Sequence, residues 1–80
     1  MRATVLVRPK EGILDPQGEA VKGSLRKLGF EVWSVRVGRV IDVELEADDS
    51  ESAREQVERM CSELLANPLI ESVQIRLEDR

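Results

Sequence analysis

The sequence has few of the side chains on which catalysis and metal binding usually depend. Its 80 residues include no histidine, no tyrosine and a single cysteine. Without histidine the chain lacks the commonest general base, the commonest metal ligand and the usual partner of a nucleophilic serine or cysteine. Cys61 falls on the apolar side of a predicted helix, and we interpret it as a buried structural thiol. The sequence therefore predicts no catalytic residue, no metal site and no cofactor site, so the chain is not expected to be an enzyme on its own.

Clustered positive charge and aromatic side chains are also missing. The 12 basic residues are scattered among 16 acidic ones, which gives a net charge of -4, and only one tryptophan and one phenylalanine are present. Nucleic-acid binding requires basic side chains that neutralise phosphates, and single-stranded RNA is usually bound by stacking on aromatic rings. The glycine-containing stretch 12–18 does not end in the lysine and serine or threonine of a phosphate-binding loop. We expect no nucleic-acid partner.

No long apolar run occurs. The first apolar stretch, residues 3–7, is far too short for a signal peptide or a membrane helix. A single cysteine cannot form an internal disulfide, so a cytoplasmic location without membrane contact is expected. The length predicts one domain, residues 1–80. So short a chain buries a small core, and association with a partner is a natural source of additional stability.

The first part of the chain predicts a strand followed by a helix. Residues 4–8 are a run rich in β-branched side chains. Asp15 directly before Pro16 is typical of a helix start, because the carboxylate accepts hydrogen bonds from free backbone N–H groups and proline has none to leave unpaired. Apolar or small residues continue at helical spacing to Leu28, and Gly29 is well placed as the C-terminal cap.

Two glycines, Gly18 and Gly23, lie inside this predicted helix. Each weakens a helix by up to roughly 1 kcal/mol relative to alanine. Close approach by another segment and simple tolerance are both open explanations.

The second part predicts a hairpin, a helix and a strand. Apolar residues alternate with polar ones on both sides of Gly38 and Arg39, which favours a hairpin over residues 30–45 with its turn at these two residues. A sustained amphipathic stripe over residues 53–65 indicates a second helix, which the proline at position 68 ends. Residues 70–77 complete the pattern as a last strand.

The element order βαββαβ predicts an α+β fold. We expect a ferredoxin-like two-layer sandwich, with a four-stranded antiparallel sheet and both helices on one face. Leu6, Val32, Val40 and Ile70 would then interrupt the polar surface of the open face. Such apolar positions suggest a surface that is covered in an oligomer, although scattered exposed aliphatic side chains are common.

Two segments are more specific than folding requires, residues 10–18 and residues 60–71. Their most specific runs are Leu-Asp-Pro-Gln-Gly at residues 14–18 and Leu-Leu-Ala-Asn-Pro at residues 64–68. Together with Leu-Gly-Phe at 28–30 and Val-Arg-Val-Gly-Arg at 35–39, they resemble the PurS family. This family is the small subunit of the formylglycinamide ribonucleotide amidotransferase (phosphoribosylformylglycinamidine synthase) of purine biosynthesis. The resemblance covers nearly the whole chain. Arg39 stands where the family more often carries lysine.

The resemblance implies a non-catalytic subunit that bridges an ATP-dependent synthetase subunit and a glutaminase subunit. Such a subunit is expected to help secure the transfer of ammonia between them. The resemblance places ATP and magnesium on the large partner subunit, and it implies self-association as a dimer or tetramer.

A set of polar, charged or glycine residues near the predicted helix ends and hairpin tip is a candidate partner interface. Gln17 and Asn67 each offer a donor and an acceptor. For Asp15 and Asn67, helix capping is an equally good explanation, and exposed arginines often contribute little. The candidates are Lys10, Asp15, Gln17, Gly18, Arg36, Arg39 and Asn67.

A second function stays open from the residues alone. A dimeric regulatory domain of the ferredoxin-like kind could bind a small effector, such as an amino acid, between its subunits. The loop over residues 12–18 is the one sequence feature that would suit this alternative.

Overall fold

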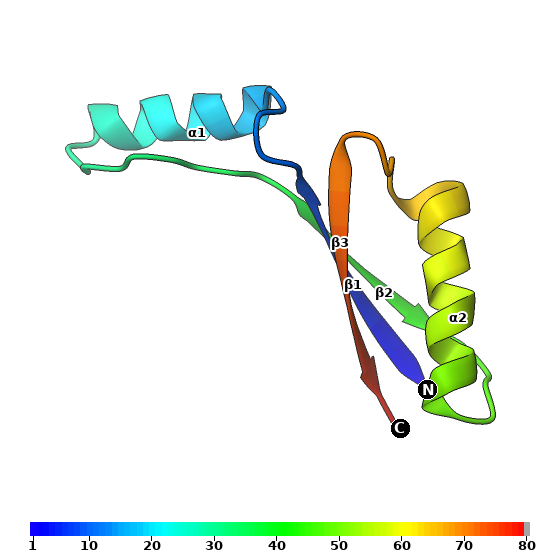
Figure 1. Cartoon of the computed structure of the whole chain (residues 1–80). Coiled ribbons are helices and arrows are strands. Elements are labelled where there is room, and N and C mark those ends of the chain that lie inside the picture. Colours follow the sequence, from blue (N-terminus) through cyan, green and yellow to red (C-terminus); the bar gives the residue numbers. More distant parts are fainter. Residues whose placement is uncertain (80) are drawn as a thin grey trace.

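The computed structural model describes residues 1–79. Its elements are a strand β1 (Arg2–Pro9), a helix α1 (Pro16–Lys27), a strand β2 (Arg39–Glu44), a helix α2 (Ser50–Met60), a π-helical turn η1 (Cys61–Leu65) and a strand β3 (Glu71–Glu78). The α+β class is confirmed, and the order of helices and strands is βαβαβ (Figure 1). No helix among the described residues is long and apolar enough to cross a membrane.

The three strands form one antiparallel sheet in the order β2-β1-β3. In the central strand, Val5 lies opposite Ile41 of β2 and opposite Ile75 of β3. The predicted strand at residues 4–8 therefore extends from residue 2 to residue 9, and the last strand is shifted by one residue from the predicted 70–77. β2 and β3 are both edge strands.

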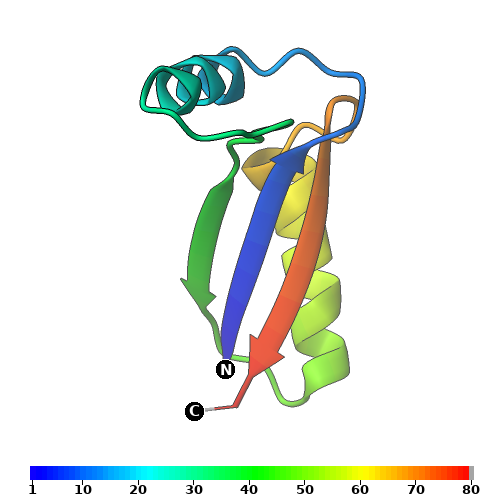
Figure 2. The same ribbon diagram turned by 90° about the vertical axis from the view of Figure 1, so that its left-hand side faces the viewer.

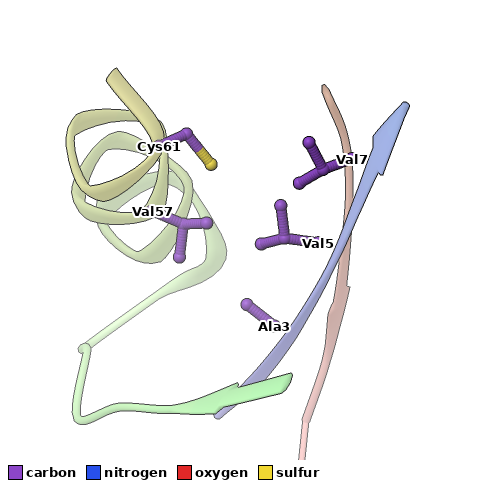
Figure 3. Close-up of a cluster of buried hydrophobic side chains, with 5 residues drawn as sticks. All are labelled: Ala3, Val5, Val7, Val57 and Cys61. Atoms are coloured by element: carbon purple, nitrogen blue, oxygen red, sulfur yellow. The ribbon is translucent and has the colours of Figure 1, made fainter. Parts of the chain in front are cut away.

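A small core lies between the sheet and α2. Alternate side chains of β1 point to the helix, and Ala3, Val5 and Val7 are at most 1% exposed. Val57 and Cys61 face them from the helix side (Figure 3). The prediction that Cys61 is a buried structural thiol is confirmed, and desolvation raises the pKa of this thiol, which disfavours the reactive thiolate.

The predicted hairpin is wrong. Residues 30–38 form no strand, so the sheet has three strands and not four among the described residues. Gly38 and Arg39 make no turn between paired strands, because Arg39 begins β2 opposite Val7. The alternation of apolar and polar residues over 30–37 indicates an extended backbone, and it does not require pairing with β2. The extended segment 30–37 runs beside α1 and does not fold back onto β2 (Figure 1).

The prediction that both helices cover the sheet is wrong for α1. This helix and the extended segment 30–37 project together from one end of the sheet, and we call this unit the arm (Figures 1 and 2). The chain is correspondingly elongated, with extents of 50 × 27 × 14 Å. Val21 is 42% exposed and Leu28 is 74% exposed. The apolar stripe of α1 therefore identified the helix correctly but is left largely uncovered within one chain.

The predicted apolar positions on the open sheet face are only partly confirmed. Leu6 and Val40 are cross-strand partners on that face, and Val40 is 62% exposed. Val32 lies in the arm and Ile70 precedes β3, so neither belongs to the sheet. The open face is therefore more polar than the sequence predicts.

Candidate interaction site

The two most specific sequence segments meet where the arm joins the sheet. The loop that leads from β1 into α1 lies beside the start of β3, and a cavity of about 250 Å³ opens between them. We call this region the junction. Its cavity is lined by Pro9, Ile13, Leu14, Asp15, Gln17, Val37, Gly38, Arg39, Ile70 and Glu71.

Asp15 holds two segments together at the junction. Its Oδ1 accepts a hydrogen bond of 3.0 Å from the backbone N–H of Gly18, which confirms the predicted helix cap. Its Oδ2 accepts a 2.8 Å bond from the backbone N–H of Val37, 22 residues away in the sequence. The bond from Val37, then the bond from Gly18 and the nearby Arg36 guanidinium, hold the pKa of Asp15 below its usual value. Each of these contacts stabilises the charged form.

Gly18 allows the extended segment to lie close to α1. A Cβ atom at this position would collide with the carbonyl oxygen of Val35. The close-approach explanation is therefore right for Gly18. At Gly23 nothing lies within 4 Å of the same position, so simple tolerance explains that glycine.

Lys10 and Arg36 connect the arm, the loop after β1 and the turn before β3. Arg36 Nη2 donates to the carbonyl oxygen of Lys10 at 2.8 Å, and Lys10 Nζ donates to the carbonyl oxygen of Pro68 at 2.8 Å. The backbone N–H of Lys10 also donates to the carbonyl oxygen of Ile70 at 2.9 Å. These bonds fix the position of the loop over residues 10–15 against the end of the sheet.

Arg39 binds Glu71 through a bidentate ion pair. Its Nη1 is 2.8 Å from Oε2 of Glu71, and its Nη2 is 3.2 Å from Oε1 and 2.6 Å from the carbonyl oxygen of Leu65. Glu71 Oε1 also accepts from the backbone N–H of Asn67 at 2.7 Å. The bond to Arg39 is the largest cause of a lowered pKa at Glu71. The sequence analysis missed Glu71, although it belongs to the specific segment that follows α2.

Asn67 and Gln17 differ in their surroundings. Asn67 Oδ1 accepts from the backbone N–H of Leu69 at 3.0 Å, so this side chain shapes its own turn. Gln17 is exposed, and its side chain has no hydrogen-bond partner within residues 1–79. The other six candidate interface residues shape the junction. The carbonyl oxygen and the NH2 group of the Gln17 side chain are both available to another molecule. The interface assignment of all seven stays a prediction.

A larger cavity of about 390 Å³ lies between α2 and β3. Cys61, Val73 and Ile75 contribute to its wall, together with the charged residues Arg54 and Glu58. A negative neighbour, Glu58, adds to burial in raising the pKa of the Cys61 thiol. No group of three or more Cys, Asp or Glu side chains within residues 1–79 could hold a metal ion. This cavity therefore offers an apolar surface and no activated nucleophile.

The free end of the arm carries both aromatic residues of the chain. Trp33 is 88% exposed and Phe30 is 58% exposed, and Leu28 lies close to them in the sequence. Aromatic side chains in exposed apolar clusters are typical of protein–protein interfaces. The arm thus presents a second interaction surface, at a distance from the junction (Figure 1).

Comparison with known proteins assigns the chain to a group of relatives of similar length. The PurS family profile, described as phosphoribosylformylglycinamidine (FGAM) synthase, matches residues 2–79. The PurS subunit of this synthase from Methanocaldococcus jannaschii is 40% identical over 78 residues, which are 96% of this chain and 94% of the relative. The PurS subunit from Bacillus subtilis is 37% identical over 79 residues, which are 98% of this chain and 93% of the relative.

Solved structures show the same fold. The crystal structure of M. jannaschii PurS, described as one of the subunits of formylglycinamide ribonucleotide amidotransferase, has a TM-score of 0.88 at 39% identity and covers 99% of this chain and 96% of the other. A chain in the structure of PurLQS from Thermotoga maritima has a TM-score of 0.86 at 36% identity, with coverage of 94% and 93%. The three-stranded sheet with a projecting arm is therefore a shape that relatives share.

Proposed function

The chain belongs to the PurS family of phosphoribosylformylglycinamidine synthase, and from this premise we propose that it is the small, non-catalytic subunit of such a synthase in purine biosynthesis. The observation that carries the proposal is the likeness, over nearly the whole chain, to the chain in the T. maritima PurLQS structure. The lack of histidine and tyrosine supports the non-catalytic role, because the usual general bases of an amidotransferase would have to come from other subunits.

The proposed partners are a synthetase subunit of the PurL kind and a glutaminase subunit of the PurQ kind. In this arrangement the synthetase subunit binds ATP and magnesium, and this chain bridges it to the glutaminase and helps keep the ammonia path closed. The junction and the free end of the arm lie at opposite ends of the arm (Figure 1), and two separated surfaces suit a bridging subunit. Gln17 is the junction residue best placed to contact a partner directly.

Self-association is the next part of the proposal, and the surface area of the chain supports it. A compact monomer of 9.0 kDa exposes about 4,900 Å². This chain exposes 6131 Å², which is larger by about 1,200 Å². A standard stable interface buries about 800 Å² on each partner. The excess is thus large enough to form the interface of a stable dimer.

The arm is the segment best suited to that dimer. β2 is an edge strand, and α2 lies on the β3 side of the sheet, so the face of β2 is only half-covered (Figure 2). Met1 and Leu45 exchange backbone hydrogen bonds, so the alternate residues Val40 and Asp42 direct their peptide groups to the outer edge. An extended segment from a second copy could pair there, while its α1 covers the half-buried Ile41 and Val43.

Charge also favours a second copy as the occupant. The end of the arm carries basic residues on α1: Lys22, Arg26 and Lys27. The charged residues at the far end of β2 and in the loop that follows are all acidic: Asp42, Glu44, Glu46, Asp48 and Asp49. An exchanged arm that pairs with β2 in the antiparallel sense would bring these opposite charges together, which guides association and orientation.

Reconstitution tests the subunit role. Purified PurL and PurQ subunits from the same source are assayed for glutamine-dependent, ATP-driven amination of the formylglycinamide ribonucleotide, with and without this chain. The particle mass is followed by light scattering. We expect activity and a heavier particle only when the chain is present. Full glutamine-dependent activity without it would refute the bridging role.

The effector-binding alternative has less support. Asp15, the charged residue in the loop that suited it, is engaged by the backbone of Gly18 and Val37. A thermal-shift panel of amino acids separates the two functions, since the bridging role predicts no response.

A further inference from the structure

Both helices of the chain begin with an aspartate, but the two aspartates bind different numbers of backbone groups. Asp49 Oδ1 accepts from the N–H of Ser52 at 2.7 Å, which is an ordinary helix cap. Asp15 makes the equivalent bond to Gly18 with one oxygen and uses the other to bind Val37. Capping alone does not require this second bond, so Asp15 has a task that Asp49 lacks.

The second bond holds the extended segment at the base of the arm. At the far end of the arm, the N–H of Phe30 donates to the carbonyl oxygen of Leu25 at 3.1 Å. Between these two points, residues 31–36 have no backbone hydrogen bond within the described part of the chain. The segment is therefore attached to α1 by backbone hydrogen bonds at Phe30 and at Val37 only.

The surroundings of Asp15 strengthen the attachment at Val37. The Asp15 side chain is 9% exposed, so its bonds are sheltered from competing water. Arg36 Nε lies 4.0 Å from Oδ2 and supplies the opposite charge. The absence of a side chain at Gly18 lets the backbone of Val35 approach the first turn of α1. All of these contacts concentrate at the N-terminus of α1.

We propose that Asp15 is the positioning residue of the arm: its carboxylate bridges the N-terminus of α1 and Val37, and thereby holds segment 30–37 beside the helix as one rigid unit. The consequence for assembly rests on the self-association proposed above. A rigid arm presents its extended edge already ordered, which lowers the entropic cost of pairing with a second copy. Without the bridge, segment 30–37 would be tied to α1 by a backbone hydrogen bond only at its distal end.

Amide NMR tests the bridge directly on the full-length chain. An N–H bonded to a carboxylate shifts as that carboxylate titrates, so the resonances of Gly18 and Val37 should follow one common acid titration. In Asp15→Ala the titration should disappear at both Gly18 and Val37, and exchange of the Val37 amide with solvent should become about tenfold faster.

Two further variants separate bridging from capping. Asparagine caps helices about as well as aspartate, but its side chain has a single acceptor oxygen. Asp15→Asn should therefore lose one of the two bonds, whereas Asp49→Asn should leave the Val37 amide unchanged. A Val37 amide that neither titrates with Asp15 nor exchanges faster in Asp15→Ala would overturn the proposal.

Self-association is measured on the same variants by sedimentation equilibrium. We expect the dimer dissociation constant to rise about tenfold in Asp15→Asn and to stay unchanged in Asp49→Asn. If the Val37 bond is lost while the dissociation constant does not change, the bridge itself stands and its role in self-association is refuted. The two proposals therefore fail in distinguishable ways.

Discussion

Replacement of Trp33 by alanine tests whether the arm joins two copies of the chain. Trp33 is 88% exposed within one chain, so its side chain contributes little to the stability of the monomer. A tryptophan that becomes buried removes about 150–250 Å² from water, worth on the order of 4–6 kcal/mol at about 25 cal/mol per Å². Incomplete burial and ordering of the interface reduce this gain, and about 2 kcal/mol is typical of an interface hot spot.

The expected result is a rise of about 30-fold in the dimer dissociation constant of Trp33→Ala. Sedimentation equilibrium over a range of protein concentrations measures it. Since Trp33 is the chain's single tryptophan, its fluorescence reports the same event in the unmodified protein. The emission should shift to shorter wavelength as concentration rises and the ring leaves water.

Leu64→Ala is the matched control. Leu64 is 84% exposed, nearly as much as Trp33, but it lies in η1 outside the arm. Its replacement should leave the dissociation constant within about twofold. The reasoning fails if Trp33→Ala associates as tightly as the unmodified chain, or if Leu64→Ala weakens association equally.

Further predictions concern glycine and charge at the junction. Gly18→Ala should lower the free energy of unfolding by about 1–3 kcal/mol, because the new Cβ collides with the backbone of Val35. Gly23→Ala in the same helix should raise the free energy of unfolding by up to about 1 kcal/mol. Urea denaturation measures both changes. The hydrogen-bonded ion pair with Arg39 lowers the pKa of Glu71 in the folded chain. The ion pair therefore stabilises the fold fully above the ordinary glutamate pKa of about 4.3. This stabilisation is lost as the pH falls through the lower pKa of the folded chain. Acid denaturation of Glu71→Gln should accordingly depend less on pH in that range, and a profile identical to that of the unmodified chain would contradict this assignment.

Local signals in the sequence identified most elements correctly. Asp15 followed by Pro16 predicted the start of α1, and the capping bond from Gly18 to Asp15 is present. Gly29 adopts a φ of +99° after α1, as expected of a C-terminal cap. The position of Cys61 on an apolar stripe predicted its burial. Each of these features depends on residues a few positions apart, so a single sequence contains the information.

Local signals did not predict which segment the extended residues 30–37 lie beside. Alternation over residues 30–37 indicated an extended backbone correctly, but pattern alone does not say which strand it pairs with. The prediction of a hairpin assumed the nearest strand, β2. In the structure, β2 pairs with β1, and segment 30–37 lies beside α1. A fourth strand of the sheet is therefore absent from the described residues of one chain.

At the candidate site, too, the sequence predicted the segments involved but not the contacts between them. The sequence selected the segments over residues 10–18 and 60–71, and these do meet at the junction. It did not predict that Arg39 binds Glu71 across 32 residues, or that Asp15 binds Val37 across 22. Such pairs are set by how the chain packs, because neither residue carries a local mark of its partner.

The sequence by itself determined the α+β class, the two helices, the first and last strands, the cap of α1 and the resemblance to the PurS family. These follow from short-range periodicity and from motifs whose residues are adjacent. The tertiary structure alone decided that the sheet has three strands, that α1 leaves it as an arm and that the junction is held by Asp15 and by the Arg39–Glu71 pair. Those outcomes depend on which distant segments satisfy one another's backbone groups and charges, and that competition is settled only when the whole chain is packed.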